Sequence, residues 1–293
     1  MNTGNHLASY REAVRQLNKG IGSHTPLEWA AKVKQLKAVW AESISALLKG
    51  AENGDVEIWH ALGNAFERGH GVDRDEEQAK AWYLRSASAG HAISMVTLGC
   101  LASRYNPTPE KLAEAIEWYQ RAAALGDSGG MISLGFAYRE GRGVPVDERR
   151  AADWFIKGYH AGAINGAELT GRLLTRRHET HVEALTWLRV AIEHGMDSVY
   201  FHLALMHGDR KSPVFDEEEA YRCWIQVAER PRGELRFMAM LALARSCRDG
   251  IGTERSRGNA IRWLDRLMAA APVTTADYRN AVRLKEEIEG ELF

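Results

Sequence analysis

The sequence predicts an all-α protein made of about six stacked helical hairpins. The first observation behind this prediction is a tryptophan that recurs every 33 to 39 residues, a period typical of helix-pair repeats. The second is that small residues keep the same distance from successive tryptophans, which indicates that one structural unit recurs. The tryptophans of the series are Trp82, Trp118, Trp154, Trp187, Trp224 and Trp263.

The small residues indicate two helices in each unit. An alanine lies one helical turn before five of the tryptophans, and a glycine suited to end a helix follows four of them by eight residues. A Leu-Gly pair begins twenty residues before the first three tryptophans. These positions are Ala79, Ala115, Ala151, Ala184 and Ala260; Gly90, Gly126, Gly162 and Gly195; and Leu62, Leu98 and Leu134. We expect one helix through each Leu-Gly pair and a second helix through each tryptophan.

The third unit shows the expected hairpin most clearly. Its first helix should run from about residue 130 to 140 and end at Gly141-Arg-Gly143, because glycine reaches positive φ without steric cost. The second helix should turn Trp154 and Phe155 inward. Leu134 should pack against the tryptophan, and the small Gly135 should let the two helices approach closely.

Further helices are expected on both sides of the repeats. Apolar residues at helical spacing mark residues 7–17, and a capping box at Thr25-Pro-Leu-Glu28, just after Gly20-Ile-Gly22, predicts the start of a long helix. Residues 277–292 read as an amphipathic capping helix. We therefore divide the chain into N-terminal helices that form a cap or a degenerate repeat (1–50), the repeats (51–271) and a C-terminal capping helix (272–293).

The third repeat reads Leu-Gly-x-x-Tyr-x-x-Gly-x-Gly-Val-x-x-Asp-x-x-x-Ala-x-x-Trp-Phe-x-Lys-x-x-x-x-Gly over residues 134–162. This pattern resembles the Sel-one-like repeat (SLR) family, relatives of the tetratricopeptide repeats. The resemblance covers roughly residues 51–271. It weakens where Asn106-Pro-Thr-Pro109 replaces the Gly-x-Gly turn and where repeat four has a shorter turn. The resemblance implies a right-handed α/α superhelix that binds other proteins, without a cofactor.

Composition narrows the classes of partner. Lys and Arg number 38 against 39 Asp and Glu, so the net charge of -1 disfavours non-specific binding to nucleic acid. The chain begins without a signal-peptide pattern and has no run of about 18 apolar residues, so we expect a cytoplasmic protein that binds no membrane. Cys100, Cys223 and Cys247 are widely separated, which fits neither a disulfide framework nor a metal site.

Several strings resemble catalytic or ligand-binding motifs, but each has a simpler interpretation. Residues 126–130, Gly-Asp-Ser-Gly-Gly, are spelled like a serine-protease nucleophile segment, yet they begin at a helix-ending glycine and are interpreted as a turn. His178-Glu-Thr-His181 lacks the zinc-protease spacing and is interpreted as a solvated turn. The acidic run 216–219 suits the start of a helix, and Cys100 is interpreted as a buried small residue. We expect no catalytic residue, no metal and no small-molecule substrate.

A candidate binding surface follows from the tetratricopeptide resemblance, in which the first helix of each pair lines the concave face. The selected positions combine apolar side chains with a recurrent arginine, which can bind a carboxylate beside a hydrophobic anchor. They are Ile93, Val96, Cys100, Arg104, Ile132, Phe136, Arg139, Arg172, Arg176, Phe201, Leu205, Met238, Leu241, Arg245 and Arg248. We expect a protein or peptide partner with acidic residues. The alternative is that superhelical curvature closes the groove and buries the apolar positions as core.

The leading interpretation is a non-enzymatic scaffold or adaptor that binds a protein partner in this groove. A narrower version, suggested by settings in which SLR chains occur, is an immunity protein that neutralises a cognate bacterial secreted toxin. An alternative of another class is a hydrolase of the β-lactamase-like SLR type. Those members are disulfide-rich and secreted, with paired cysteines in every repeat, and this chain departs from them on both counts.

Overall fold

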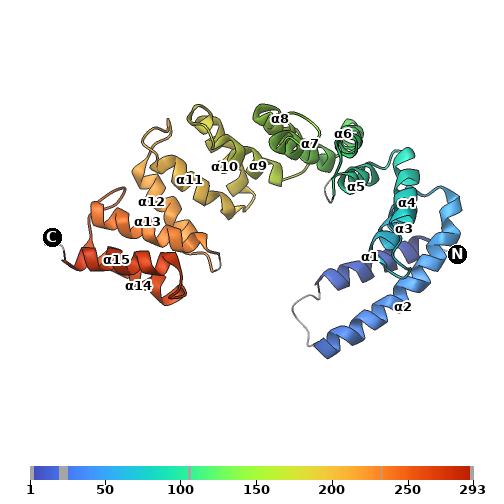
Figure 1. Ribbon diagram of the computed structural model, residues 1–293, viewed down its shortest axis with the longest axis horizontal. Coiled ribbons are helices and arrows are strands. Elements are labelled where there is room, and N and C mark those ends of the chain that lie inside the picture. Colours follow the sequence, from blue (N-terminus) through green and yellow to red (C-terminus); the bar gives the residue numbers. More distant parts are fainter. Residues whose placement is uncertain (1–2, 20–25, 105–106, 232, 291–293) are drawn as a thin grey trace. The chain divides into compact units, whose positions relative to one another are not determined.

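The computed structural model describes residues 3–19, 26–104, 107–231 and 233–290, and the side chains of these residues other than 3, 18–19 and 26–33. Over these ranges the chain forms α-helices and three short 3₁₀ segments, and no strand (Figure 1). The helices are α1 (Thr3–Lys19), α2 (Pro26–Gly50), α3 (Val56–Arg68), α4 (Glu76–Ser88), α5 (Ala92–Ala102), α6 (Pro109–Ala124), α7 (Ser128–Glu140), α8 (Glu148–His160), α9 (Asn165–Leu174), α10 (His181–Glu193), α11 (Tyr200–Gly208), α12 (Glu217–Ala228), α13 (Leu235–Asp249), α14 (Arg257–Ala270) and α15 (Ala276–Gly290).

Six helix pairs, from α3–α4 to α13–α14, match the six predicted hairpins, so the all-α repeat fold is confirmed. The chain divides into two compact units, Met1–Ala161 and Gly162–Phe293. The first unit contains α1 to α8 and the second contains α9 to α15. The divisions expected at residues 50 and 271 stay predictions.

The helices that flank the pairs also form. Leu7, Tyr10 and Ala13 of α1 are buried in a cluster with α2 and α3, and Leu284 and Ile288 of α15 are buried against α13 and α14. Helix α2 begins at Pro26 as expected. The capping-box side chains and the Gly20-Ile-Gly22 turn lie outside the described residues.

Each of the first four pairs is locked by a glycine that faces a large side chain. A Cβ atom added to the glycine of the first helix would lie only 2.4 to 2.6 Å from a side-chain atom of the second helix. The pairs are Gly63 with Tyr83, Gly99 with Tyr119, Gly135 with Phe155, and Gly171 with Leu188. The partner is therefore the residue after the repeated tryptophan. In the third repeat Trp154 itself packs against the cluster that contains Leu134, as predicted.

The repeated tryptophans are half-buried. In four repeats a basic side chain one turn later covers the ring, with its charged group 4.3 to 5.7 Å from the ring centroid. The pairs are Trp82 with Arg85, Trp118 with Arg121, Trp154 with Lys157, and Trp263 with Arg266. Cation–π contact at helical spacing gives the tryptophan a role at the surface as well as in the core.

The second glycine of each Gly-x-Gly turn packs against the preceding helix pair. A Cβ atom on Gly71 would meet the Trp40 backbone at 2.7 Å, and one on Gly143 would meet the Leu112 carbonyl oxygen at 2.8 Å. A Cβ atom on Gly252 would lie still closer to the Glu217 carbonyl oxygen. All three glycines have positive φ. These turns therefore join one repeat to the next. Gly71 packs on α2 in the way that Gly143 and Gly252 pack on the second helix of the preceding repeat.

Gly143→Ala is expected to lower the free energy of unfolding by about 2 kcal/mol. The methyl group would collide with the Leu112 carbonyl, and a φ of +76° is unfavourable for any residue with a Cβ atom. Gly258→Ala in α14 is the matched control, since no atom lies within 4 Å of its added Cβ and helical glycine is itself unfavourable. Chemical denaturation should show no loss for the control; wild-type stability for Gly143→Ala would contradict the close packing.

The polar strings of the sequence prove to be helix caps. Asp127, in the protease-like string, caps α7 by accepting a hydrogen bond from the Gly130 amide at 2.8 Å, so this string is the helix-to-helix turn that was predicted. Asp216 caps α12 in the same way, through the Glu219 amide at 3.0 Å. The acidic run therefore lies at a helix start, as predicted.

Candidate functional site

The first unit contains a pocket of about 570 Å³ between α5, α6 and α7. We call it the α5–α7 pocket. Its wall is largely apolar, and charged side chains lie at its edge. The lining residues are Cys100, Ser103, Arg104, Leu112, Ala115, Ile116, Tyr119, Ser133, Phe136, Ala137, Glu140 and Arg142. The size and the mixture of apolar wall and few polar groups are typical of a binding site.

The structure brings three of the predicted groove residues, Cys100, Arg104 and Phe136, together in this pocket. Cys100 is exposed, which corrects its interpretation as a buried small residue. Other predicted residues of the first unit lie outside the lining. Ile93 is 54% exposed, whereas Val96 and Ile132 are half-buried and pack on their neighbours.

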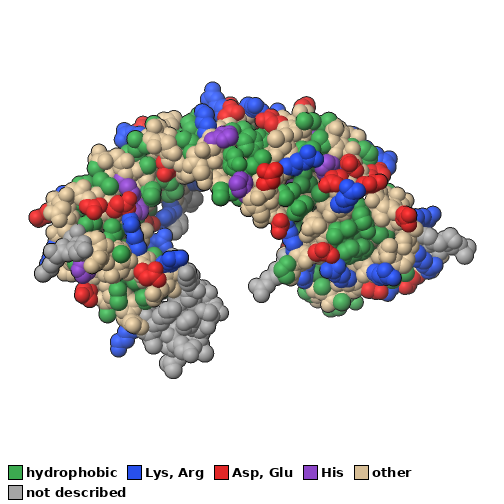
Figure 2. Space-filling model, turned by 180° about the vertical axis from the view of Figure 1, so that it is seen from behind, with side chains coloured by type: hydrophobic (Ala, Val, Ile, Leu, Met, Phe, Trp, Pro, Cys, Tyr) green, Lys and Arg blue, Asp and Glu red, His purple; other side chains and the backbone are tan. Residues whose placement is uncertain are grey.

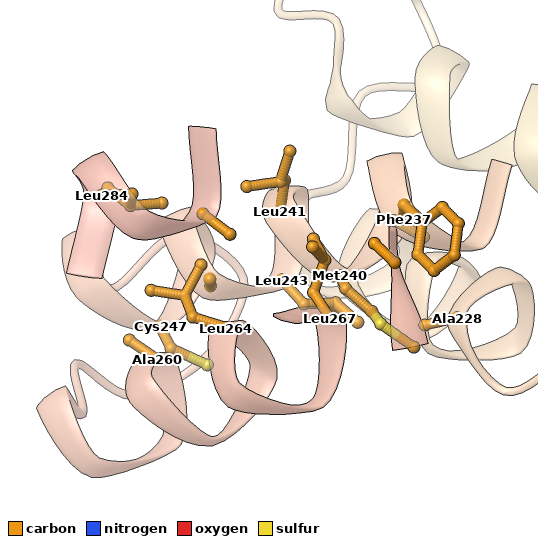
Figure 3. Packing of buried hydrophobic residues seen from close by; sticks show 14 of the residues in the cluster. Ala228, Phe237, Met240, Leu241, Leu243, Cys247, Ala260, Leu264, Leu267 and Leu284 are labelled. Carbon is orange, nitrogen blue, oxygen red and sulfur yellow. The ribbon is translucent and has the colours of Figure 1, made fainter. Parts of the chain in front are cut away.

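In the second unit the predicted residues divide between surface and core. Leu205 and Met238 are about half exposed, and Arg172, Arg176 and Arg245 lie at the surface. Phe201 is half-buried, with its ring edge-on to Trp224 at 5.7 Å. Leu241 is buried in the cluster of α12 to α15, which Figure 3 shows beside Met240 and Leu264. The prediction that Leu241 lies in a binding surface was wrong, because Leu241 is part of the core. This is the outcome that the closed-groove alternative predicted for every apolar position.

Most of the predicted arginines already have carboxylate partners within their own unit. Arg104 lies 2.9 Å from Glu67, Arg139 2.5 Å from Glu140, and Arg172 3.3 Å from Glu168. Arg248 contacts Asp249 at 2.6 Å and Glu287 at 3.7 Å. On the face shown in Figure 2, acidic and basic side chains are correspondingly interspersed. The recurrent arginine is therefore weaker evidence for an acidic partner than the sequence suggested.

Phe136 is held in a fixed orientation at the pocket. Its ring lies edge-on to the buried Phe155 at 5.2 Å, and the Arg139 guanidinium covers the other side at 4.6 Å. The neighbouring Tyr119 contributes a hydroxyl that contacts Ser103 at 3.3 Å and Cys100 Sγ at 3.6 Å. Burial raises the pKa of Tyr119, so the hydroxyl stays protonated and donates to Cys100 Sγ. The pocket thus has rigid aromatic walls with a small polar group between them.

Sequence reasoning missed the floor of the pocket and one charged residue at its edge. Leu112, Ile116 and Tyr119 belong to the second helix of repeat two, whereas only first helices were considered. Arg142 is the middle residue of the Gly141–Gly143 turn. The Gly-x-Gly pattern could have pointed to Arg142, because two glycines that adopt positive φ fix the position of the residue between them.

A buried polar cluster joins α3, α4 and α5. Ser94 Oγ lies 2.9 Å from His60 Nδ1 and 2.8 Å from His91 Nδ1, and it donates to Ser86 Oγ at 2.9 Å. His91 Nε2 lies 3.4 Å from Glu57. Serine, histidine and glutamate thus lie in the order of a hydrolase triad, but Ser94 is fully buried and its hydrogen is used by Ser86. This cluster fastens helices together and cannot reach a substrate.

The histidines near residue 180 have structural partners. His178 is exposed and lies 2.6 Å from Asp209. His181, predicted to be solvated, is buried at the start of α10, where it bonds Ser212 Oγ at 2.8 Å and the Thr175 carbonyl at 3.1 Å. That prediction was wrong because the short turn folds under the 209–212 loop. Across the described ranges, no three His, Cys, Asp or Glu side chains lie where they could hold a metal ion. No helix found in those ranges is both long and apolar enough to cross a membrane.

Two solved structures with similar folds are SLR or Sel1 repeat proteins. A protective antigen present in uropathogenic Escherichia coli strains, which displays an SLR fold, matches with a TM-score of 0.60 and 24% identity over 91% of this chain and 60% of its own. The chain therefore spans less than two thirds of that relative's length. A Sel1 repeat protein from Oxalobacter formigenes matches with a TM-score of 0.56 and 20% identity, over 83% of this chain and 96% of its own.

A weaker match is an immunity protein from Pseudomonas aeruginosa, with a TM-score of 0.42 and 20% identity over 76% of this chain and 80% of its own. At that TM-score the likeness carries no weight for function. No curated protein matches the sequence.

The family model for the Sel1 repeat matches five segments of the chain, 60–91, 105–127, 128–162, 198–230 and 237–267. The segments cover more than half of the sequence. Four of them each span parts of both helices of a pair, and the segment 105–127 covers α6 alone. The pair without a match is α9–α10, which has the shortened turn. The chain belongs to the Sel1 repeat family.

Proposed function

We propose that this protein is a non-enzymatic interaction module that binds a protein partner, and that the α5–α7 pocket is a docking site. The observation that carries the proposal is the pocket itself: a rigid, largely apolar concavity on a helical-repeat fold. Apolar pockets with aromatic walls and arginines at the edge are typical of interface hot spots. The Phe136 ring, fixed between Phe155 and Arg139, supplies the aromatic wall.

Ser133→Trp is expected to abolish capture of the partner. Ser133 lies on α7 in the pocket lining, where a tryptophan would fill the space. Thr186→Trp is the matched control, since the Thr186 hydroxyl also bonds the carbonyl four residues earlier but lies exposed on α10 in the other unit. Wild type and both variants are immobilised, exposed to lysate of the native organism and compared by quantitative mass spectrometry. A partner retained by Ser133→Trp would count against the pocket.

Cys100 offers an independent block of the same pocket. Cys100 is exposed, whereas Cys223 and Cys247 are buried, so a bulky maleimide should modify Cys100 first. The modified protein should fail to capture the same proteins that the Ser133→Trp variant fails to capture. A secreted toxin among them would assign the immunity role. Activity above buffer in a screen with ester, phosphodiester and β-lactam reporters would instead favour the hydrolase alternative.

A further inference from the structure

The Arg142 side chain is displayed at the edge of the α5–α7 pocket by a rigid turn. Gly141, with φ of +71°, ends α7, and the Arg142 amide then donates to the Ala137 carbonyl at 3.0 Å. Gly143 presses against the Leu112 carbonyl of α6. The two neighbours of Arg142 are thus fixed to α7 and α6, two of the three helices that form the pocket. A guanidinium on such a platform loses little conformational freedom when it binds a ligand.

Arg142 also differs in charge balance from the other arginines near the pocket. Arg104 and Arg139 are neutralised by Glu67 and Glu140. Arg142 donates to the neutral backbone carbonyl of Ser103, and among the described residues no carboxylate forms an ion pair with it. A guanidinium has five N–H donors, so donors remain for a bidentate acceptor. The edge of the pocket therefore carries an unbalanced positive charge beside an apolar floor.

The same position in other repeats does not provide this charge. His70 occupies it in the first repeat, where it is buried and stacked on Trp40 at 4.3 Å. Ile251 occupies it in the last. Since the turn is a common feature of the repeats and the arginine is not, its charge is explained by binding at this pocket better than by the packing of the array.

We propose that the α5–α7 pocket recognises a peptide segment that inserts an apolar side chain and pairs an adjacent carboxylate with Arg142. The apolar side chain packs between Phe136, Ile116 and Leu112, and the bound segment shields the new ion pair from water. Charge-assisted bidentate bonds of this kind add selectivity for a planar carboxylate. This inference rests on the proposed function, because it specifies the ligand of the same pocket.

The first experiment is selection of a phage-displayed library of random 12-residue peptides on four proteins: wild type, Ser133→Trp, Arg142→Gln and Arg74→Gln. The glutamine introduced by Arg142→Gln retains an N–H donor for the Ser103 carbonyl but removes the charge. Arg74 is an exposed turn arginine of the first repeat, and its substitution removes the same charge away from the pocket. Wild type and Arg74→Gln should enrich peptides with an apolar residue next to Asp or Glu. Arg142→Gln should keep the apolar residue and lose the acidic preference, and Ser133→Trp should lose both.

The second experiment measures affinities for one selected peptide and its analogue in which Gln replaces Glu. Wild type should bind the carboxylate peptide roughly tenfold more tightly than the amide peptide, and Arg142→Gln should bind both equally. Equal binding of the two peptides by wild type, or a preference that survives in Arg142→Gln, would overturn the carboxylate inference alone. Failure to enrich any peptide, or peptides unaffected by Ser133→Trp, would count against the proposed function as well.

Discussion

Phe155→Ala is expected to lower the free energy of unfolding by about 4 kcal/mol. Phe155 is fully buried, faces the Gly135 backbone and supports the ring of Phe136. Truncation leaves a cavity that Gly135 cannot fill, because it has no side chain to move into the space. The loss is measured by chemical denaturation followed by circular dichroism.

Trp154→Ala is the comparison that tests the register of the repeat. Trp154 is half-buried under Lys157, so its truncation should cost about half as much, in proportion to the smaller apolar area removed from water. A larger loss for Trp154→Ala than for Phe155→Ala would show that the tryptophan, after all, fills the centre of the hairpin.

Stability is expected to fall by about 3 kcal/mol as the pH is lowered from 6.5 to 4. Burial, and secondarily the neighbouring His91, lowers the pKa of His60 to about 4. Above pH 6.5 the imidazole is neutral in both states and has no effect. Below pH 6.5 the His60 imidazole becomes protonated in the unfolded chain, whereas in the folded protein it stays neutral down to about pH 4. Acid therefore favours unfolding. Burial also lowers the pKa of His70 and His202, which adds loss of the same sign.

His60→Asn should remove most of this acid sensitivity. The asparagine side chain can still bond Ser94 but does not titrate. His160→Asn, at the exposed end of α8, should keep the acid sensitivity of the wild type. The readout is the difference in unfolding free energy between pH 7 and pH 4.5 within each protein, which separates titration from packing. An unchanged difference in His60→Asn would assign the acid sensitivity to other groups, such as His70 and His202, whose pKa values burial also lowers.

Spacing along the chain was enough to predict the helix pairs, because the same local pattern of residues recurs in each repeat. Glycines at helix ends, aspartates at helix starts and apolar residues one turn apart are local requirements, and they led to the correct pairs. Which of two adjacent aromatic residues fills the hairpin was not decided by spacing. Trp154 and Phe155 both lie on the inward side, and only the position of Gly135 across the pair selects Phe155.

The binding surface was predicted less well than the fold. Cys100, Arg104 and Phe136 do meet in one pocket, since their positions on first helices place them on one side. Leu241, at the position that Val96 and Ile132 hold in repeats two and three, is buried in a cluster to which α12, α14 and α15 also contribute, and these helices lie in other parts of the sequence. Likewise, the ion pairs of Arg104 and Arg139 were not predicted, because helical periodicity does not give the distances between charged side chains.

The sequence by itself determined the all-α class, the repeat and its family, because these follow from helical periodicity and from the backbone needs of glycine. The tertiary structure decided where a pocket opens and which charges remain unbalanced beside it. Arg142 lies on a turn, where periodicity carries no information, and its neighbours are fixed by packing of the turn on α6. A pocket depends on the space left between three helices, and that space is a property of their packing.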